Sequence, residues 1–180
     1  MQTAKEIGFP VAMKLIAPEV VHKTESGAVV LGLNNAEEVE AQAKRLLALA
    51  KGSAKLLLQE MVQGTEIILG ARTDPQYGPF LIMGLGGIFV EVLKDVALRL
   101  LPVSESETWA MLKELKGYKV LEGTRGQPPR DTAALVKAMV GLSDIFLNYR
   151  NHLSDLEFNP IMLRAQGQGL AAVDVRMIRK

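Results

Sequence analysis

The first part of the chain holds the residue types of a phosphate-binding site. Lys14 follows three apolar residues at 11–13, and His22 and Lys23 come eight and nine positions later in a polar loop. A lysine beside a buried strand often extends to solvent, and a histidine in a loop is often a plain surface residue. However, an ammonium group also suits nucleotide phosphates, and a neutral imidazole is a competent nucleophile near pH 7. The stretch is therefore either an ordinary strand with a solvated loop or a basic cradle for an anion.

A second polar group lies near the C-terminus, in "DLEFNP", where Asp155, Glu157 and Asn159 occupy alternate positions. In a strand, alternate side chains point to the same face. Three oxygen-bearing side chains on one face of a strand rich in Leu, Phe and Ile are costly to bury unless they are satisfied. Carboxylate and amide oxygens are ligands for magnesium or manganese, and Asp174 lies on the expected partner strand. We therefore expect a metal site here, with an exposed edge face as the alternative.

Glycine-rich phosphate motifs receive little support. The loop around Lys23 lacks the G-x-x-x-x-G-K-[ST] spacing of a Walker A motif. The stretch "GLGG" at 84–87 would let the backbone approach a phosphate, but it lacks the spacing and the helix of a dinucleotide-binding motif. On their own these glycines are a weak signal.

Composition excludes several classes of protein. The 180 residues are 48% hydrophobic, which predicts a packed globular chain rather than a disordered one. The net charge of +1 has acids and bases interspersed, so we expect no nucleic-acid partner. The absence of cysteine excludes disulfides and thiolate metal sites and favours the cytoplasm. No apolar run approaches the roughly 20 residues that span a bilayer, so we expect no membrane association.

Local patterns predict the elements that position these residues. Alternating or continuous apolar runs predict strands, at 11–16, 28–33, 55–62, 65–73, 80–85, 88–93, 96–101, 156–163 and 170–178. Asn35 is expected to cap an amphipathic helix that ends at Gly52. Ser104 begins a second helix, with Glu107 completing a capping box, and Asp131 caps a third that reaches about Tyr149.

The order of these elements predicts an α+β protein with two lobes. Two strands and a helix come first, and many strands with two helices follow, without an internal repeat. We expect the division near residues 62 to 64. The predicted parts are an N-terminal lobe at 1–62 and a C-terminal lobe with the metal-binding strands at 63–180.

Taken together, the chain resembles the ATP-grasp domain of the NDP-forming acyl-CoA synthetases. This family includes the ADP-forming acetyl-CoA synthetases and relatives of succinyl-CoA synthetase. The resemblance is carried, in the family's order and over nearly the whole chain, by "GFPVAMK", "HKTESGAVVLGL", "QEMVQGTE", "DPQYGPFLIMGLGGIFVEVLKDVALRLLPV", "GTRG" and "DLEFNPIML…AVDVR". It implies an ATP-grasp fold, with a small N-terminal lobe, a larger C-terminal lobe and a nucleotide cleft between them.

The resemblance also implies roles for the nucleotide-binding residues. Lys14 would bind the phosphates of ATP or ADP. Glu66, in the "GTE" position, would contact the sugar or phosphate side of the nucleotide. An inter-lobe hinge along the adenine would be formed by Glu60, Met61 and Val62, and Gln59 would also bind the nucleotide.

The remaining implied roles concern the metal and the phosphoryl group. Asn159 and Asp174 would carry Mg²⁺, with Glu157 near it. In the ADP-forming members the histidine of the "HK" loop is a phosphoryl carrier, and that role falls on His22, with Lys23 beside it.

The implied activity is the nucleotide-binding, phosphoryl-transfer half of an ADP-forming acid–CoA ligase. The overall reaction would be acyl-CoA + ADP + phosphate ⇌ acid + CoA + ATP, through phosphohistidine. The chain would need a CoA-binding partner subunit or domain that carries a phosphohistidine, in an oligomeric assembly. Two departures from the family are Gly27-Ala28 in place of two glycines and a later start, so we expect the first lobe to be truncated.

Two alternative functions stay open at this point. One is a nucleotide-sensing regulatory module, like the ligase-like part of some bacterial protein acetyltransferases. The other is an ATP-grasp ligase that joins a carboxylate to an amine, which does not require the "HK" loop.

Overall fold

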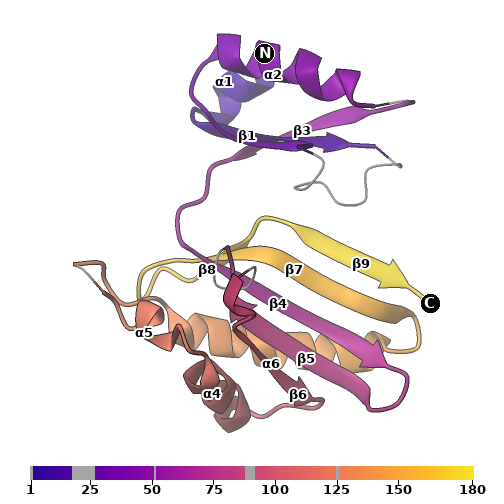
Figure 1. Ribbon diagram of the computed structural model, residues 1–180, viewed down its shortest axis with the longest axis vertical. Helices are drawn as coiled ribbons and strands as arrows, with labels where there is room; N and C mark the ends of the chain where they lie inside the picture. The colour runs from indigo at the N-terminus through magenta and orange to yellow at the C-terminus, as the bar shows by residue number, and fades with distance from the viewer. Residues whose placement is uncertain (1, 18–26, 51, 88–91, 125) are drawn as a thin grey trace. The chain divides into compact units, whose positions relative to one another are not determined.

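The computed structural model describes residues 2–17, 27–50, 52–87, 92–124 and 126–180. The chain divides into two compact units, Met1–Met61 and Val62–Lys180. Each unit combines helices with its own antiparallel sheet (Figure 1), which confirms the α+β class.

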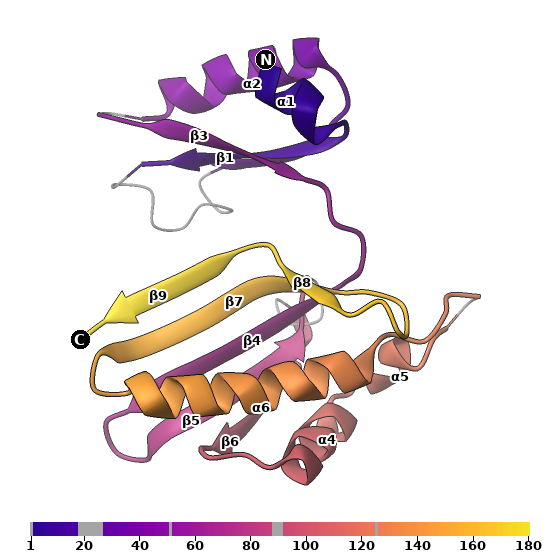
Figure 2. The ribbon, with the colours of Figure 1, turned by 180° about the vertical axis from the view of Figure 1, so that it is seen from behind.

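The N-terminal unit is built on a three-stranded antiparallel sheet in the order β2-β1-β3. Its elements, in chain order, are α1 (Gln2–Ile7), β1 (Val11–Ile16), β2 (Val29–Leu33), α2 (Ala36–Ala48) and β3 (Lys55–Glu60). Helices α1 and α2 lie on the same face of this sheet (Figure 2).

Alternation along β1 explains which side chains the helices cover. Val11, Met13 and Leu15 are buried in a cluster with Val39 and Leu46 of α2. Because successive side chains of a strand point to opposite faces, the residues between them lie on the other face of the sheet. Burial of the first set against α2 thus fixes the register of the strand.

The C-terminal unit contains a six-stranded sheet, in which β6-β5-β4-β7-β8 are neighbours and β9 pairs with β7. The strands are β4 (Thr65–Asp74), β5 (Gly78–Leu85), β6 (Val96–Leu100), β7 (Leu153–Leu163), β8 (Leu170–Ala172) and β9 (Val175–Arg179). The helices are α4 (Glu105–Glu114), α5 (Tyr118–Leu121) and α6 (Thr132–Tyr149). Helices α4 and α6 cover one face of the sheet (Figure 2).

The larger core lies between this sheet and α6. Ile67, Leu69 and Ala71 of β4 are buried against apolar residues of α6, such as Met139 and Phe146. The alternate residues of β4 therefore point to the opposite sheet face, which we call the face opposite α6. No helix of the described residues is both long enough and apolar enough to cross a membrane.

The predicted helix caps are confirmed. The side chain of Asn35 accepts a hydrogen bond from Glu38 N at 2.9 Å. Ser104 and Glu107 form the reciprocal capping box of α4. Asp131 accepts from Ala134 N at 3.1 Å at the start of α6. These caps satisfy backbone N–H groups that helices otherwise leave unpaired.

Several predicted elements were wrong. The strand expected at 88–93 is helical at Val92 and Leu93, and its first part lies outside the described residues. A short apolar run does not distinguish the two structures, because its periodicity is too brief. The strand expected at 170–178 is two strands, β8 and β9, interrupted at Val173 and Asp174. The first predicted helix ends at Ala48 rather than at Gly52, and α1 was not predicted.

Candidate functional site

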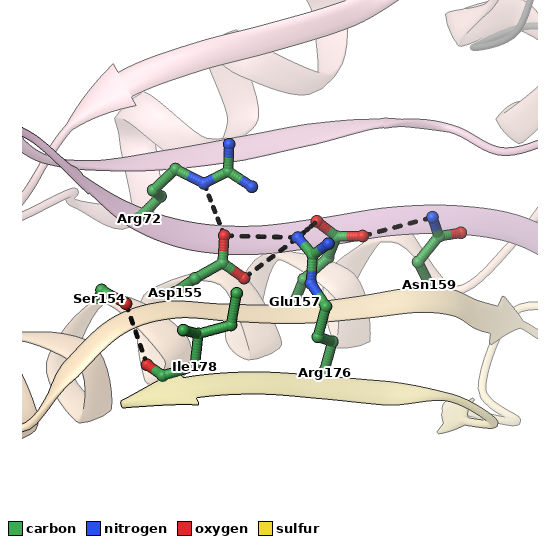
Figure 3. Close-up of polar contacts among 7 residues, drawn as sticks. All are labelled: Arg72, Ser154, Asp155, Glu157, Asn159, Arg176 and Ile178. Atoms are coloured by element: carbon green, nitrogen blue, oxygen red, sulfur yellow. Dashed lines mark hydrogen bonds and ion pairs between the residues drawn. The ribbon is translucent and has the colours of Figure 1, made fainter. Parts of the chain in front are cut away.

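Charged side chains gather on the face opposite α6, where β7 lies between β4 and β9 (Figure 3). The register pairs Arg72 of β4 with Asp155 of β7, and Glu157 of β7 with Arg176 of β9. Directly opposed residues of antiparallel strands have side chains on the same face. Strand pairing therefore brings two acids and two arginines together from distant parts of the sequence.

The buried carboxylate of Asp155 is the centre of this cluster. Its side chain is only 7% exposed, and its Oδ2 accepts a 2.5 Å hydrogen bond from Arg72 Nε. Arg176 Nη2 lies 3.3 Å and 3.4 Å from the two carboxylate oxygens of Asp155. The same Nη2 donates to Glu157 Oε2 at 2.8 Å. Figure 3 shows the Arg176 guanidinium between the two acids.

This arrangement changes the interpretation of the alternating polar residues in "DLEFNP". The sequence suggested that a hard cation satisfies all three. In the structure, Asp155 is satisfied instead by the guanidinium groups of Arg72 and Arg176. Pairing a buried carboxylate with arginine avoids the cost of burying an isolated charge. Asp155 is thus a structural anchor, and the candidate metal ligands lie further along the strand.

The three residues expected at the metal are neighbours. Asn159 N donates to the backbone oxygen of Asp174 at 3.1 Å, which sets the two residues side by side. Asn159 Nδ2 lies 3.4 Å from Glu157 Oε1. The side chain of Asp174 accepts a hydrogen bond from Val175 N at 3.0 Å. The middle of β7 and the break between β8 and β9 therefore place two carboxylate residues and one amide residue beside one another.

This donor set suits magnesium only in part. Carboxylate and amide oxygens are hard ligands of the kind that Mg²⁺ takes. In the part of the chain that the structure describes, however, no group of three or more His, Cys, Asp or Glu is arranged to hold a metal. Mg²⁺ is commonly bound by one or two carboxylates together with waters and substrate phosphates. The residues present fit a metal that is shared with a phosphate.

In the N-terminal unit, Lys14 is buried, with 6% of its surface exposed. It pairs with Leu57 in the register of β1 and β3, and Ala12 pairs with Gln59. Lys14 and Gln59 therefore share the sheet face that α2 does not cover. Lys14 does not extend freely to solvent, as a lysine beside a strand often does.

The other residues expected at the nucleotide lie at or beyond the end of β3. Glu60 pairs with Val11, so its exposed side chain is on the face opposite to that of Gln59. Met61 and Val62 lie in the segment that joins the two units. Their expected contacts with a nucleotide stay predictions.

Glu66 lies at the start of β4, beside the glycines at 84–87. Its backbone oxygen accepts a 2.7 Å hydrogen bond from Gly86 N. A Cβ at Gly86 would lie 2.7 Å from the Cβ of Glu66, and a Cβ at Gly84 would lie 2.6 Å from the backbone oxygen of Asp95. Close packing of neighbouring backbone therefore accounts for these two glycines without a phosphate.

His22 and Lys23, the expected phosphoryl carrier and its neighbour, lie outside the described residues. Their roles stay predictions. The rest of the loop at 18–26 also lies outside the described residues.

Asp131 joins the start of α6 to the β7–β8 hairpin. Its Oδ2 accepts from Gly169 N at 2.8 Å, while its Oδ1 accepts from Ala134 N. These backbone donors, with that of Gly169 the larger influence, hold the pKa of the Asp131 carboxyl below its ordinary value. The hairpin leads into β8 and then to the break before β9, so this contact supports the segment that carries Asp174, a candidate metal ligand.

Sequence reasoning missed Arg72 and Arg176. Arg176 had a readable signal, because it lies two residues after Asp174 and an extended segment places such residues on one face. Arg72 had none, because its contact with Asp155 depends on the pairing of strands that are far apart in sequence.

Comparison with known proteins identifies the fold. Residues 1–178 match the ATP-grasp domain family. The chain is 35% identical to the beta subunit of acetate–CoA ligase [ADP-forming] II from Pyrococcus furiosus, covering 100% of this chain and 79% of that subunit. It is 36% identical to 4-hydroxybutyrate–CoA ligase [ADP-forming] from Nitrosopumilus maritimus, but spans only 26% of that protein.

A solved structure is similar over nearly the whole chain. It is the dinucleotide-forming acetyl-coenzyme A synthetase 1 of Ca. Korarchaeum cryptofilum, in complex with coenzyme A and Mg-AMPPCP. Its phosphohistidine segment points towards the nucleotide-binding site. The TM-score is 0.82 at 35% identity, covering 99% of this chain and 80% of that chain.

The chain has two α+β units, each built on an antiparallel sheet, and it matches the ATP-grasp family over residues 1–178. Together these findings define an ATP-grasp protein. The chain belongs to the ATP-grasp family of the ADP-forming acyl-CoA synthetases, and it corresponds to their nucleotide-binding part.

Proposed function

We propose that the chain binds ATP or ADP with Mg²⁺ and carries out the phosphoryl-transfer half of an ADP-forming acid–CoA ligase reaction. The observation that carries this proposal is the match along the chain to the beta subunit of such a ligase. A similar structure, bound to Mg-AMPPCP, supports the choice of ligand. The absence of cysteine is in keeping with a cytoplasmic protein.

The proposed nucleotide contacts divide between the two units. Lys14 would bind phosphate oxygens, since a buried ammonium group is a strong partner for a multiply charged anion. Gln59, Glu60, Met61 and Val62 would lie along the base, and Glu66 near the sugar or phosphates.

Asn159 and Asp174 would hold the metal, with Glu157 close by. When bound, Mg²⁺ neutralises charge on the phosphates and orients them for transfer. The protein's contribution is to fix these oxygens: a backbone hydrogen bond ties Asn159 to Asp174, and Arg176 restrains Glu157. Positioned charges of this kind are the main source of rate enhancement in phosphoryl transfer.

His22 would be the phosphoryl acceptor. The bond between the γ-phosphorus and the bridging oxygen breaks, ADP leaves, and a nitrogen–phosphorus bond forms on the imidazole, whose proton passes to solvent. The reverse reaction makes ATP from ADP. Lys23 would stabilise the negative charge on the transferred group. A CoA-binding partner with its own phosphohistidine would exchange the group with His22.

Labelling with [γ-³²P]ATP tests this function. With Mg²⁺, the chain should acquire a label that is stable in alkali and released by acid, as expected of phosphohistidine. The chain has two histidines. His22→Ala should abolish the label while ATP still binds, and the matched control His152→Ala should keep it. ATP binding without any label would contradict the transfer role and favour a nucleotide-sensing module.

A further inference from the structure

Arg176 holds an unusual place among the candidate metal residues. One of its nitrogens, Nη2, contacts two carboxylates: it lies 2.8 Å from Glu157 Oε2 and 3.3 Å from Asp155 Oδ1. Asp155 is buried and is held from its other side by Arg72. The Arg176 guanidinium is therefore anchored (Figure 3), although its side chain is 43% exposed. An anchored guanidinium restrains the more exposed acid, Glu157.

This restraint changes what Glu157 offers to a metal. Oε2 is occupied by Arg176, and Oε1 lies 3.4 Å from Asn159 Nδ2. A divalent ion would have to compete with a guanidinium for the first oxygen. Glu157 can therefore contribute its second oxygen at most without breaking an ion pair.

The formal charges around the candidate metal residues also disfavour a metal that binds without a nucleotide. The acids of the cluster and of the candidate metal residues are Asp155, Glu157 and Asp174, and the arginines of the cluster are Arg72 and Arg176. Their formal charges sum to −1, because two positive groups offset two of the three negative ones. A metal that arrives alone meets little uncompensated negative charge. A metal that arrives with a polyphosphate brings its own anionic ligands.

We propose that Arg176 is a positioning residue that holds Glu157 and makes metal binding at Asn159 and Asp174 depend on a bound polyphosphate. This inference rests on the proposed function, since it concerns the same metal. By linkage, a metal that requires the nucleotide also raises the nucleotide's affinity by the same factor. The site would then select the metal–nucleotide complex over either component.

Replacing Arg176 by an uncharged residue removes both the competition and the compensating charge. Arg176→Met should bind Mn²⁺, used as a substitute for Mg²⁺, more tightly than the wild type in the absence of nucleotide. From Coulomb's law across a partly solvated site, the expected gain is roughly three- to tenfold. Asp155 keeps its 2.5 Å contact with Arg72, so the variant is expected to fold.

Two control variants show whether the effect depends on a positive charge at position 176 or on the loss of any arginine from β9. Arg176→Lys keeps a cation at the same place and should bind Mn²⁺ nearly as the wild type does. Arg179→Met removes the same charge from the same strand, at a residue that forms no ion pair with any other described residue. It should leave the affinity for Mn²⁺ unchanged. Circular dichroism checks folding, and Arg176→Gln is a second uncharged variant.

The measurement is the electron paramagnetic resonance signal of free Mn²⁺, titrated with residues 1–180, with and without a non-hydrolysable ATP analogue. Because the analogue itself binds Mn²⁺, each titration is compared with the same Mn²⁺ and analogue without protein. In the wild type the analogue should strengthen Mn²⁺ binding strongly, and in Arg176→Met this enhancement should shrink. Unchanged or weaker Mn²⁺ binding by Arg176→Met would overturn the inference, while the proposed function would stand. Failure of the wild type to bind Mn²⁺ even with the analogue would overturn both.

Discussion

Arg72 and Asp155 stand 83 residues apart in the sequence, and a 2.5 Å hydrogen bond from Nε to Oδ2 joins them across β4 and β7. The side chain of Asp155 is buried, whereas that of Arg72 is 52% exposed. The pair therefore ties the central strands of the sheet together beside the candidate metal residues. It also supplies one of the two cations that allow a carboxylate to be buried there.

Removing Arg72 should destabilise the chain. Arg72→Met leaves Asp155 with Arg176 as its remaining cation, and a hydrogen bond to a buried charged group contributes about 1–3 kcal/mol. Partial exposure of Arg72 places the expected loss toward the lower end of that range. Urea unfolding measures it. Arg72→Lys should recover part of the loss, and equal stability of Arg72→Met and the wild type would show that the contact contributes nothing.

The stability of the chain should fall in acid partly through Asp131. Its folded pKa lies below its ordinary value because two backbone N–H groups donate to it. Its contribution is therefore complete above the unfolded pKa, about 3.9, and is lost as the pH falls through the folded value. Asp131→Asn keeps one acceptor oxygen instead of two, so we expect a loss of about 1 kcal/mol at pH 7.

Urea midpoints between pH 7 and pH 3 test this. Below about pH 4 the wild type should lose stability more steeply than Asp131→Asn, so the two curves should converge. Asp144→Asn, at an exposed position of the same helix, is the control and should retain the wild-type pH dependence. Parallel curves for the wild type and Asp131→Asn would contradict the account.

Local signals in the sequence predicted much of this fold. The caps at Asn35, Ser104 and Asp131 were readable, because a capping side chain acts on backbone only three residues away. The long apolar strands could also be predicted from the sequence. Short elements were not: Val92 and Leu93 lie in a run too brief to separate helix from strand.

The candidate site was predictable where its residues share a strand, and Asp174 was also expected beside them from the partner segment. Alternation placed Asp155, Glu157 and Asn159 on one face, but it did not reveal what faces them. The pairing of Asp155 with Arg72 depends on which strands are neighbours in the sheet, and no local pattern encodes that. The sequence therefore suggested a metal at Asp155, where the structure instead has the guanidinium groups of Arg72 and Arg176.

Gly84 should not tolerate a side chain. A Cβ there would lie 2.6 Å from the backbone oxygen of Asp95, and backbone cannot move aside cheaply. Gly84→Ala should therefore cost about 2 kcal/mol or more in the free energy of unfolding. Gly141→Ala, in α6 with open space around its Cβ, should instead stabilise by about 0.5–1 kcal/mol. Thermal or urea unfolding would contradict the packing argument if both variants behaved alike.

Lys14 should contribute to the binding of phosphates rather than of the base. Lys14→Met preserves much of the buried apolar volume and removes the charge, so ATP and ADP affinity should fall by about tenfold or more. Adenosine affinity should barely change. Lys55→Met removes an exposed lysine from the same sheet face and is the matched control. Equal losses for adenosine and ATP would indicate a folding defect instead of a lost phosphate contact.

The central claim is that this chain holds a nucleotide through a metal at Asn159 and Asp174. Isothermal titration calorimetry with ATP, in Mg²⁺ and in EDTA, tests it most directly, on the wild type and on Asp174→Asn. We expect the wild type to bind ATP much more tightly with Mg²⁺, and the variant to lose most of that difference while remaining folded by circular dichroism. An ATP affinity that is the same with and without Mg²⁺ in the wild type, or a metal dependence that survives in Asp174→Asn, would contradict the account.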